Sequence, residues 1–344
     1  MSTPLINAAA DPEAVWLVTG CSSGFGKSLA EALASRGVRL VATARRIETL
    51  EFLPSTDHVL RCALDVTAPS SIDAAVKAAM SRFGRIDVVV NNAGIGVIGP
   101  VEDVTDEQTR LQFEVNVFGV FNMVRATAPV FRAQRRGMFI NFSSMAGISS
   151  IDSLGVYSAS KFAVEGLSDA LTSELASYGV RVMLVEPGPF DTAWLGKNAI
   201  WGSRDNERYP AVWGYVEMMK GVYADRAQVG DPARAAQAII TAATSDNPPA
   251  RLPLHEMSVD TSRMKLRAWR PTSIAWKRWP ATYTTRLEPD EGEQRAAREL
   301  LGAACLLTRP QPAVPCSGRW PAATSRWEPE PCFWQVCLPP SPLI

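Results

Sequence analysis

The feature that most constrains the fold of this chain is a regular alternation, from Val15 onward, of short apolar runs and longer amphipathic segments. The short runs are rich in β-branched residues and show little polar alternation, as strands do when both faces are buried. Parallel strands need long crossover connections, which the amphipathic segments supply as helices. The pattern therefore predicts a doubly wound parallel sheet in three α/β/α layers. Its expected strands are 15–19, 38–43, 59–64, 86–90, 138–142 and 180–185.

The βα pattern fills only part of the 344-residue chain. We expect a short polar arm over 1–14, a single α/β domain over 15–269 and an irregular extension over 270–344. In the extension Pro, Trp and Arg accumulate and periodicity fades, with one helical pattern over 289–307. Such a segment does not form a core of its own. We expect it to be poorly ordered or translated in a shifted frame, the alternative being a partner-binding tail.

The charge and the apolar runs exclude several classes of function. The formal net charge is zero, from 35 Lys and Arg against 35 Asp and Glu, so we expect no nucleic acid or anionic membrane surface as partner. No apolar run reaches the roughly 20 residues of a membrane-spanning helix. The start of the chain lacks the features of a signal peptide. The six cysteines show no metal-ligand spacing, so we expect no metal and a cytoplasmic, reducing setting.

A glycine-rich turn, Thr19-Gly20-Cys21-Ser22-Ser23-Gly24-Phe25-Gly26, follows the first expected strand and opens a helix. Glycines let the backbone approach a ligand closely, and the free N–H groups at a helix start favour a pyrophosphate. A tight structural turn is the alternative. A strand before the turn and a helix after it are the context that a dinucleotide-binding turn requires. We therefore predict a Rossmann-type domain.

The second strand runs into Arg45 and Arg46, with no acid before Glu48. In a dinucleotide fold this position inspects the adenosine ribose: an acid reads the free hydroxyls of NAD, and an Arg accommodates the 2′-phosphate of NADP. The sequence predicts NADP(H) in preference to NAD(H). Ordinary loop arginines are the alternative.

The later strands also end in turns with polar or cyclic side chains. Asp65 follows the third strand and could accept a hydrogen bond from an adenine amino group or cap the next helix. The fourth, fifth and sixth strands are followed by Asn91-Asn92-Ala93-Gly94, by Ser143-Ser144 and by Glu186-Pro187-Gly188-Pro189-Phe190-Asp191-Thr192. Ligands of open α/β sheets bind at the carboxyl ends of the strands, so these turns are expected to converge on one site.

Tyr157 and Lys161 stand four residues apart in an expected helix, and therefore on one face. A phenol has a pKa of about 10 and needs a nearby positive charge to exchange a proton near neutral pH. Lys161 could supply that charge, although a solvated helix face is the alternative. Asn116 interrupts an otherwise apolar helix face, and a buried Asn must find partners. Structural hydrogen bonding alone could explain it.

The Thr-Gly-x-x-x-Gly-x-Gly turn, the Asn-Asn-Ala-Gly motif, the Ser and the Tyr-x-x-x-Lys, in this order, resemble the short-chain dehydrogenase/reductase family. The resemblance covers about residues 15–254. The turn and Ala42-Thr43-Ala44-Arg45 look most like the 17β-hydroxysteroid-dehydrogenase-like branch, which commonly prefers NADP. Phe25 replaces the aliphatic residue usual in the turn. Because that position contributes mainly backbone and packing, we expect cofactor binding to survive.

The resemblance implies roles for individual residues. Tyr157 would be the general acid/base, and Lys161 would lower its pKa and hold the nicotinamide ribose. Ser144 would hydrogen-bond the substrate oxygen, and Asn116 would organise a water-linked proton path. The implied cofactor contacts are Gly20, Ser22, Ser23, Gly24, Phe25 and Gly26 for the pyrophosphate, Asp65 and Val66 for the adenine, Asn92, with Ala93 and Gly94, for the ribose region, and Pro187, Gly188 and Thr192 for the nicotinamide end.

Residues 190–223 form a long segment rich in aromatic side chains and Met. Such linings suit apolar ligands and predict a substrate lid; a packed helical hairpin is the alternative. The large side chains of this segment are Trp194, Leu195, Ile200, Trp201, Tyr209, Trp213, Tyr215, Met218 and Met219. A hydrophobic ketone, aldehyde or secondary alcohol follows as the expected substrate, with steroid-like or retinoid-like compounds suggested by analogy alone.

The sequence thus predicts an NADP(H)-dependent oxidoreductase that interconverts a hydrophobic ketone or aldehyde and its alcohol. A non-catalytic NADP-binding sensor on the same fold is one alternative, but such proteins typically lose the Tyr or the Lys. A sugar-nucleotide epimerase or dehydratase is another, but its Gly motif is spaced differently. The resemblance further implies a homodimer or homotetramer, built on the Tyr157 helix and on the helix near 109–132.

Overall fold

The computed structural model describes residues 7–192, 194–195, 199–204, 207–225 and 228–268. The expected extension over 270–344, with its helix over 289–307, lies outside the described residues, as do the first six residues of the arm. Among the helices described, none has the length and apolar character needed to cross a membrane.

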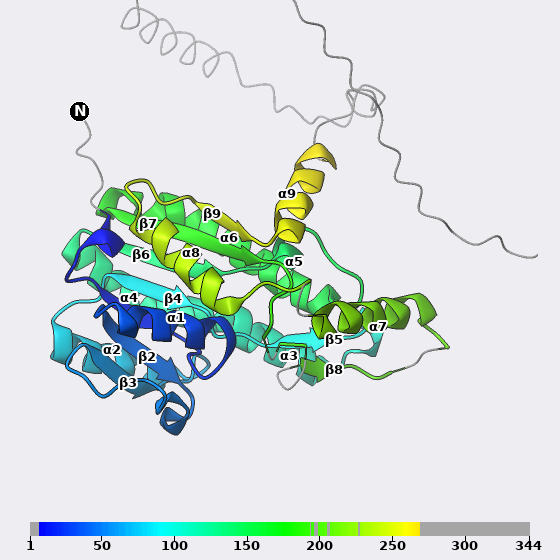
Figure 1. Ribbon diagram of the computed structural model, residues 1–344, viewed down its shortest axis with the longest axis horizontal. Helices are drawn as coiled ribbons and strands as arrows, with labels where there is room; N and C mark the ends of the chain where they lie inside the picture. Colours follow the sequence, from blue (N-terminus) through cyan, green and yellow to red (C-terminus); the bar gives the residue numbers. More distant parts are fainter. Residues whose placement is uncertain (1–6, 193, 196–198, 205–206, 226–227, 269–344) are drawn as a thin grey trace, which may run out of the picture. The chain divides into compact units, whose positions relative to one another are not determined.

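A seven-stranded sheet forms the centre of the described domain, in the order β3-β2-β1-β4-β6-β7-β9 (Figure 1). Every pair of neighbouring strands in it is parallel. Its strands are β1 (Val15–Val18), β2 (Arg39–Ala44), β3 (Val59–Ala63), β4 (Val88–Asn91), β6 (Gly137–Phe142), β7 (Val180–Pro187) and β9 (Arg251–Leu254). The order reverses between β1 and β4, as in a doubly wound fold, so the predicted Rossmann-type sheet is confirmed.

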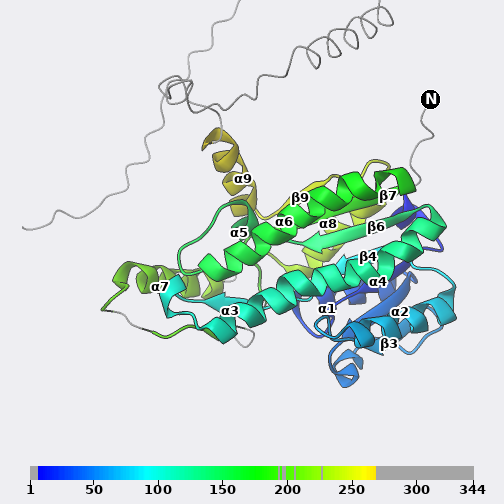
Figure 2. The same ribbon diagram turned by 180° about the vertical axis from the view of Figure 1, so that it is seen from behind.

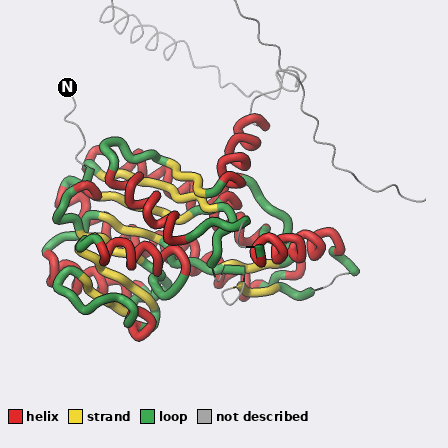
Figure 3. The backbone as a smooth tube through the Cα atoms, viewed as in Figure 1, coloured by secondary structure: helices red, strands yellow, loops and turns green. Residues whose placement is uncertain are grey.

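Helices cover both faces of this sheet (Figures 2 and 3). One face packs against α1 (Gly24–Ser35) and α8 (Pro232–Thr244), whose buried residues share a core cluster with Trp16 and Ile140. The opposite face packs against α2 (Pro69–Phe83), α4 (Gly119–Gln134) and α6 (Gly155–Leu175). Strands β1, β2, β4, β6 and β7 are buried at their central residues, which explains their apolar runs, whereas the two edge strands β3 and β9 are only partly buried.

The helix expected near 109–132 is longer than predicted and changes its winding. It begins as α3 (Asp106–Phe113), passes through a π-helical turn, η4 (Glu114–Phe118), and continues as α4. Thr105 starts it with a capping box, in which Thr105 Oγ1 accepts from the Gln108 N–H at 3.2 Å and Gln108 Oε1 accepts from the Thr105 N–H at 3.1 Å. The π turn places Asn116 on the buried side.

A second, two-stranded sheet lies beyond the carboxyl ends of the central strands, beside α7 (Pro210–Ala224) (Figure 1). It pairs β5 (Gly96–Ile98) with β8 (Ala199–Trp201) in parallel. Neither strand was predicted. The alternative for 190–223 was a packed helical hairpin. The described residues of this segment form the strand β8 and nearly all of the helix α7 instead. Short elements complete the domain: η1 (Ala8–Ala10), η2 (Ile47–Leu50), η3 (Val101–Asp103), α5 (Met145–Ile148), η5 (Ala176–Tyr178) and α9 (Glu256–Ala268).

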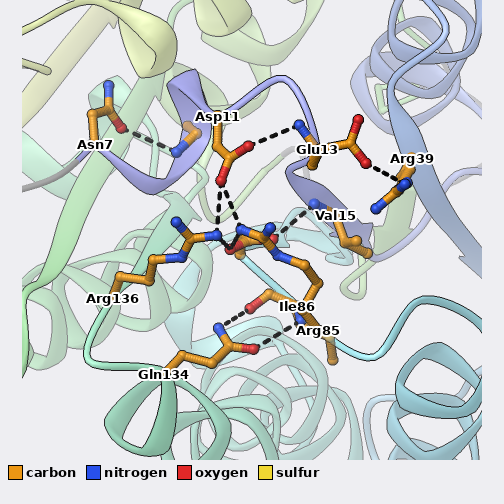
Figure 4. A network of polar contacts seen from close by, with 11 residues as sticks. Asn7, Asp11, Glu13, Val15, Arg39, Arg85, Ile86, Gln134 and Arg136 are labelled. Carbon is orange, nitrogen blue, oxygen red and sulfur yellow. Dashed lines mark hydrogen bonds and ion pairs between the residues drawn. The ribbon is translucent and has the colours of Figure 1, made fainter.

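At the amino end of the sheet a buried carboxylate ties the arm to the core (Figure 4). Asp87 is fully buried; its Oδ2 accepts from the Val15 N–H at 3.0 Å and its Oδ1 from Arg85 at 2.6 Å. Arg85 and Arg136 also bind Asp11 of the arm, at 3.0 and 2.8 Å. A buried charge needs such pairing. This cluster lies at the amino ends of the strands, opposite to the carboxyl ends that carry the predicted site, and we assign it a structural role.

Candidate functional site

A cavity of about 610 Å³ opens at the carboxyl ends of the central strands, where α/β sheets bind ligands. It gathers almost all of the predicted site residues from turns that are far apart in the chain. Those that line it are Gly20, Ser22, Ser23, Gly24, Phe25, Arg45, Asp65, Val66, Asn92, Ala93, Gly94, Ser144, Tyr157, Lys161, Pro187, Gly188 and Thr192. Gly26 and Asn116 do not line the cavity.

The glycine-rich turn favours glycine at three positions, two because of the backbone conformation and one because there is no room for a side chain. Gly20 and Gly24 have φ of +71° and +55°, a region that disfavours other residues. Gly26 stands behind the turn: a Cβ there would lie 2.5 Å from Asn92 Nδ2 and closer still to the Gly20 carbonyl oxygen. The phenyl ring of Phe25 packs against Phe190, with ring centroids 4.8 Å apart, as expected for a packing position.

Hydrogen bonds that the sequence did not reveal lock the first turn to the turn after β4. Thr19 Oγ1 accepts from the N–H groups of Asn92 and Ala93, at 3.0 and 3.1 Å. Asn92 Nδ2 donates to the carbonyl oxygens of Thr19 and Gly20, at 2.8 and 3.2 Å. The amide of Asn92, expected near a ribose, is thus engaged by the glycine turn itself. A Thr ending one strand and an Asn following another were the only available signals.

The two side chains expected at the adenosine end differ in how far they are engaged. Arg45 lines the cavity, is exposed, and within the described residues forms no hydrogen bond or ion pair. Asp65 Oδ1 accepts from the Thr67 N–H at 2.9 Å and from its hydroxyl at 2.8 Å. Asp65 therefore shapes its own turn and does not cap α2, whose N-cap is Ala68.

Ser144, Tyr157 and Lys161 meet at the end of β6. Tyr157 is 8% exposed and Lys161 6%, both on the buried face of α6. Lys161 Nζ donates to the Phe142 carbonyl oxygen at 2.8 Å and lies 5.6 Å from the centre of the Tyr157 ring. The Ser144 hydroxyl caps α5, accepting from the Ala146 N–H at 3.1 Å, and donates to the Pro187 carbonyl oxygen at 3.5 Å. A serine, a phenol and a cation therefore face one end of the cavity.

Burial dominates the proton affinities of this pair. Burial raises the pKa of Tyr157 to about 12, and the neighbouring Ser144 hydroxyl partly opposes this rise. Burial lowers the pKa of Lys161 to about 8, against the opposing negative charge of Glu165. Loss of hydration therefore dominates the Tyr157 pKa in this structure, and the lowering of that pKa by Lys161 stays a prediction.

Asn116 is buried behind the cavity and holds its wall. Its Oδ1 accepts from the Ile95 N–H at 2.9 Å and its Nδ2 donates to the Ile95 carbonyl oxygen at 3.0 Å. Gln112, one turn earlier and not predicted, donates to the same carbonyl at 3.0 Å and accepts from the Val97 N–H at 2.7 Å. The two amides fix the segment that becomes β5, so structural satisfaction accounts for every contact Asn116 makes here.

The far half of the cavity is bounded by part of segment 190–223. Trp194 packs against the reacting end, with its ring centroid 5.0 Å from that of Tyr157. The predicted large side chains that line the cavity are Trp194, Leu195, Ile200, Tyr215 and Met219. Trp213, by contrast, is a core residue stacked on Trp201, and Met218 is 56% exposed. The expected apolar lining is therefore supplied by a subset of the segment.

Comparison with known proteins identifies the domain. Residues 14–201 match the family model described as short chain dehydrogenase. The chain belongs to the short-chain dehydrogenase family. It is an oxidoreductase of this type, and its membership of the 17β-hydroxysteroid-dehydrogenase-like branch stays a prediction.

Relatives in the short-chain dehydrogenase family cover most of the described domain. The 3-ketodihydrosphingosine reductase of Bacteroides thetaiotaomicron is 36% identical over 261 residues, covering 75% of this chain and 93% of the relative. A short-chain dehydrogenase structure from Streptomyces avermitilis is 37% identical with a TM-score of 0.70, covering 77% of this chain and 97% of that one.

Other solved short-chain dehydrogenases contain either dinucleotide. One from Burkholderia cenocepacia, in complex with NADP, is 27% identical with a TM-score of 0.59, covering 78% of this chain and 98% of that one. One from Burkholderia phymatum, in complex with NAD, is 25% identical with a TM-score of 0.63, covering 75% and 94%. Similarity alone therefore does not choose between the two cofactors.

The packing of Gly26 yields a test of the turn. Gly26→Ala should weaken binding of NADPH and NADH alike, by at least about tenfold, because the turn must move away from the new methyl group. Gly166→Ala in α6, where a Cβ meets nothing within 4 Å, is the matched control and should bind normally. Titration calorimetry measures both, and wild-type affinity in Gly26→Ala would refute the close-packing argument.

Proposed function

We propose that the chain is an NADP(H)-dependent dehydrogenase/reductase that interconverts a hydrophobic ketone or aldehyde and the corresponding alcohol. The observation that carries the proposal is the convergence of Ser144, Tyr157 and Lys161 at one end of a cavity whose other end is the glycine-rich turn. This spacing of a phosphate-binding turn and a proton donor suits a dinucleotide lying along the strand ends.

The residues present fit such a cofactor. Gly20 and Gly24 have positive φ angles and no side chains, and this leaves room for a pyrophosphate at the start of α1. Asp65 and Val66 would flank the adenine, and Pro187, Gly188 and Thr192 the nicotinamide. When bound, the nicotinamide would supply or accept the hydride. Asn92, which hydrogen-bonds to the turn, is proposed to position the turn.

Tyr157 is proposed to give its hydroxyl proton to the carbonyl oxygen during reduction and to take one from the alcohol during oxidation. The Ser144 hydroxyl, which lines the same cavity as Tyr157, would donate to the same substrate oxygen and stabilise its developing charge. Lys161 would present a desolvated ammonium near the phenol and hold the nicotinamide ribose. Asn116 would support the proton path as a positioning residue, because both its amide atoms bind Ile95.

A hydrophobic substrate is supported by the far half of the cavity. Ile98, Ile151, Leu154, Leu195 and Ile200 line it, so an apolar chain placed there would leave water for a hydrocarbon surface. The name of the Bacteroides thetaiotaomicron relative, a reductase of a keto compound, supports reduction of a ketone. We propose that segment 190–223 acts as the substrate lid.

Tyr157→Phe tests the reaction and separates it from a sensor function. We expect it to bind NADPH with near wild-type affinity and to lose at least about a thousandfold in kcat with a long-chain ketone, because the proposed proton donor is removed while the cofactor-binding turn is untouched. Tyr178→Phe, at the other end of the sheet, should keep full turnover. Full turnover in Tyr157→Phe would overturn the mechanism. A wild-type chain that binds NADPH and reduces no carbonyl would favour the sensor.

Arg45→Leu tests the choice of cofactor. Arg45 faces the cavity with no protein partner among the described residues, so its loss should weaken NADPH by about tenfold or more and leave NADH nearly unaffected. Arg46→Leu removes an exposed neighbour that does not line the cavity and is the matched control. Fluorescence titration gives the ratio of the two dissociation constants, and an unchanged ratio in Arg45→Leu would defeat the assignment.

We also propose association as a homodimer or homotetramer through α4 and α6. Phe118, the last residue of η4 before α4, is 48% exposed and Phe162 of α6 39% exposed, so both present large apolar side chains to solvent. Sedimentation velocity should show an oligomer, and Phe162→Asp should shift it toward the monomer. Leu266→Asp, on an exposed residue of α9, should leave the mass unchanged. A wild-type monomer would contradict the proposal.

A further inference from the structure

Two hydroxyl groups in the lid half of the cavity have no part in the proposed chemistry. Tyr215 and Tyr223 come from α7, about two helical turns apart, and both line the cavity together with Val216 and Met219. Helix α7 therefore turns a mixed face toward the substrate space: two phenols and two apolar side chains.

Neither phenol has a hydrogen-bond partner within the described part of the chain, and both side chains are partly buried. Neither hydroxyl oxygen is among the inaccessible polar atoms that lack a partner, so both are open to water in the cavity, and a substrate that displaces this water must replace its hydrogen bonds. The contrast lies on the same helix: Tyr209, the N-cap of α7, hydrogen-bonds to Glu102 outside the cavity. The free hydroxyls of Tyr215 and Tyr223 thus face the space that a substrate would fill.

Tyr223 lines the same cavity as the reacting group, Tyr157. Burial raises its pKa above the ordinary range of Tyr, and the negative charges that Tyr157 and Tyr215 would carry raise it further. Burial and the charge of Asp152 raise the pKa of Tyr215. Both phenols therefore stay protonated at neutral pH and can donate as well as accept a hydrogen bond.

The surroundings of these phenols are largely apolar and fixed. Trp194 packs on Tyr157, and a Cβ on Gly96 would lie 2.7 Å from the Trp194 indole, so the missing side chain of Gly96 gives the indole its seat. Thr192 Oγ1 accepts from the Trp194 N–H at 3.4 Å. Ser143, Ser153 and Thr192 add further hydroxyl groups to the lining. A polar group of the substrate would find few partners here apart from the two phenols of α7.

We propose that Tyr223, assisted by Tyr215, is a specificity-determining residue that recognises a hydroxyl group carried by the substrate near its carbonyl. The substrate class is then an amphiphilic hydroxy ketone, in which the carbonyl meets Tyr157, the hydroxyl meets α7 and an apolar chain fills the lid half. This inference rests on the proposed function, because it takes the carbonyl to lie at Tyr157.

The test compares a long-chain ketone with its α- and β-hydroxy counterparts of equal chain length, using NADPH and the full chain. Wild type should reduce one hydroxy ketone at least tenfold more efficiently, in kcat/KM, than the plain ketone. Tyr223→Phe should reduce that preference by about 10- to 100-fold, since an unmatched buried hydroxyl is costly. Tyr215→Phe should reduce it by a smaller factor, and Tyr178→Phe should keep the wild-type preference.

The outcomes separate this inference from the proposed function. If wild type reduces all three ketones equally well, or if Tyr223→Phe and Tyr215→Phe both keep the full preference, the inference is wrong while the proposed function stands. If no ketone is reduced with either dinucleotide, the proposed function fails and the inference with it. Should Tyr223→Phe not fold, as judged by its thermal unfolding, Tyr215→Phe alone decides, and an unaltered preference in that variant overturns the proposal.

Discussion

The parallel pairing of β1 with β2 on one side and β4 on the other is the constraint on which the rest of the structure depends. It puts the turns after these strands at one edge, with a crevice where the strand order reverses. Thr19 and Asn92 then bind the two turns to each other, so that the glycine turn is held by four hydrogen bonds from its neighbour. The residues proposed to bind cofactor or substrate lie around these two joined turns, in the cavity at the carboxyl ends of the strands.

Burial, more than pairing of charges, sets the electrostatics of the domain. Tyr157 and Lys161 are both shifted toward their neutral forms, because their surroundings offer little hydration. A carboxylate that is buried in the described domain is paired with an opposite charge. Glu186 is nearly inaccessible and is bound by Arg251 of β9 at 2.6 Å; Arg251 also pairs with Glu165 of α6. This cluster fastens the edge strand β9 to β7 and to α6, the helix that carries Tyr157.

The site combines a rigid floor with a wall of different construction. The floor consists of strand ends and of amides locked to backbone groups, such as Asn116 and Gln112 on Ile95. The wall is α7 and β8: β8 pairs with β5 in a sheet of its own, and Trp213 and Val216 of α7 pack in one apolar cluster with Tyr157. Conserving the geometry of the reacting groups and varying the wall is a physical route to different substrates on one fold. Tyr215 and Tyr223 of α7 belong to this wall.

The sequence by itself determined the parallel sheet, the position of the glycine turn and the order of the motifs, because strand burial and helix periodicity are written in the spacing of apolar residues. It missed β9, a four-residue edge strand that contains Pro253 and Arg251, and it missed β5 and β8, whose three residues each carry no periodic signal. Only the tertiary structure decided that Asn92 holds the glycine turn, that burial raises the Tyr157 pKa, and that Tyr215 and Tyr223 line the cavity. Hydration and partners depend on which distant segments pack together, and no local pattern contains that information.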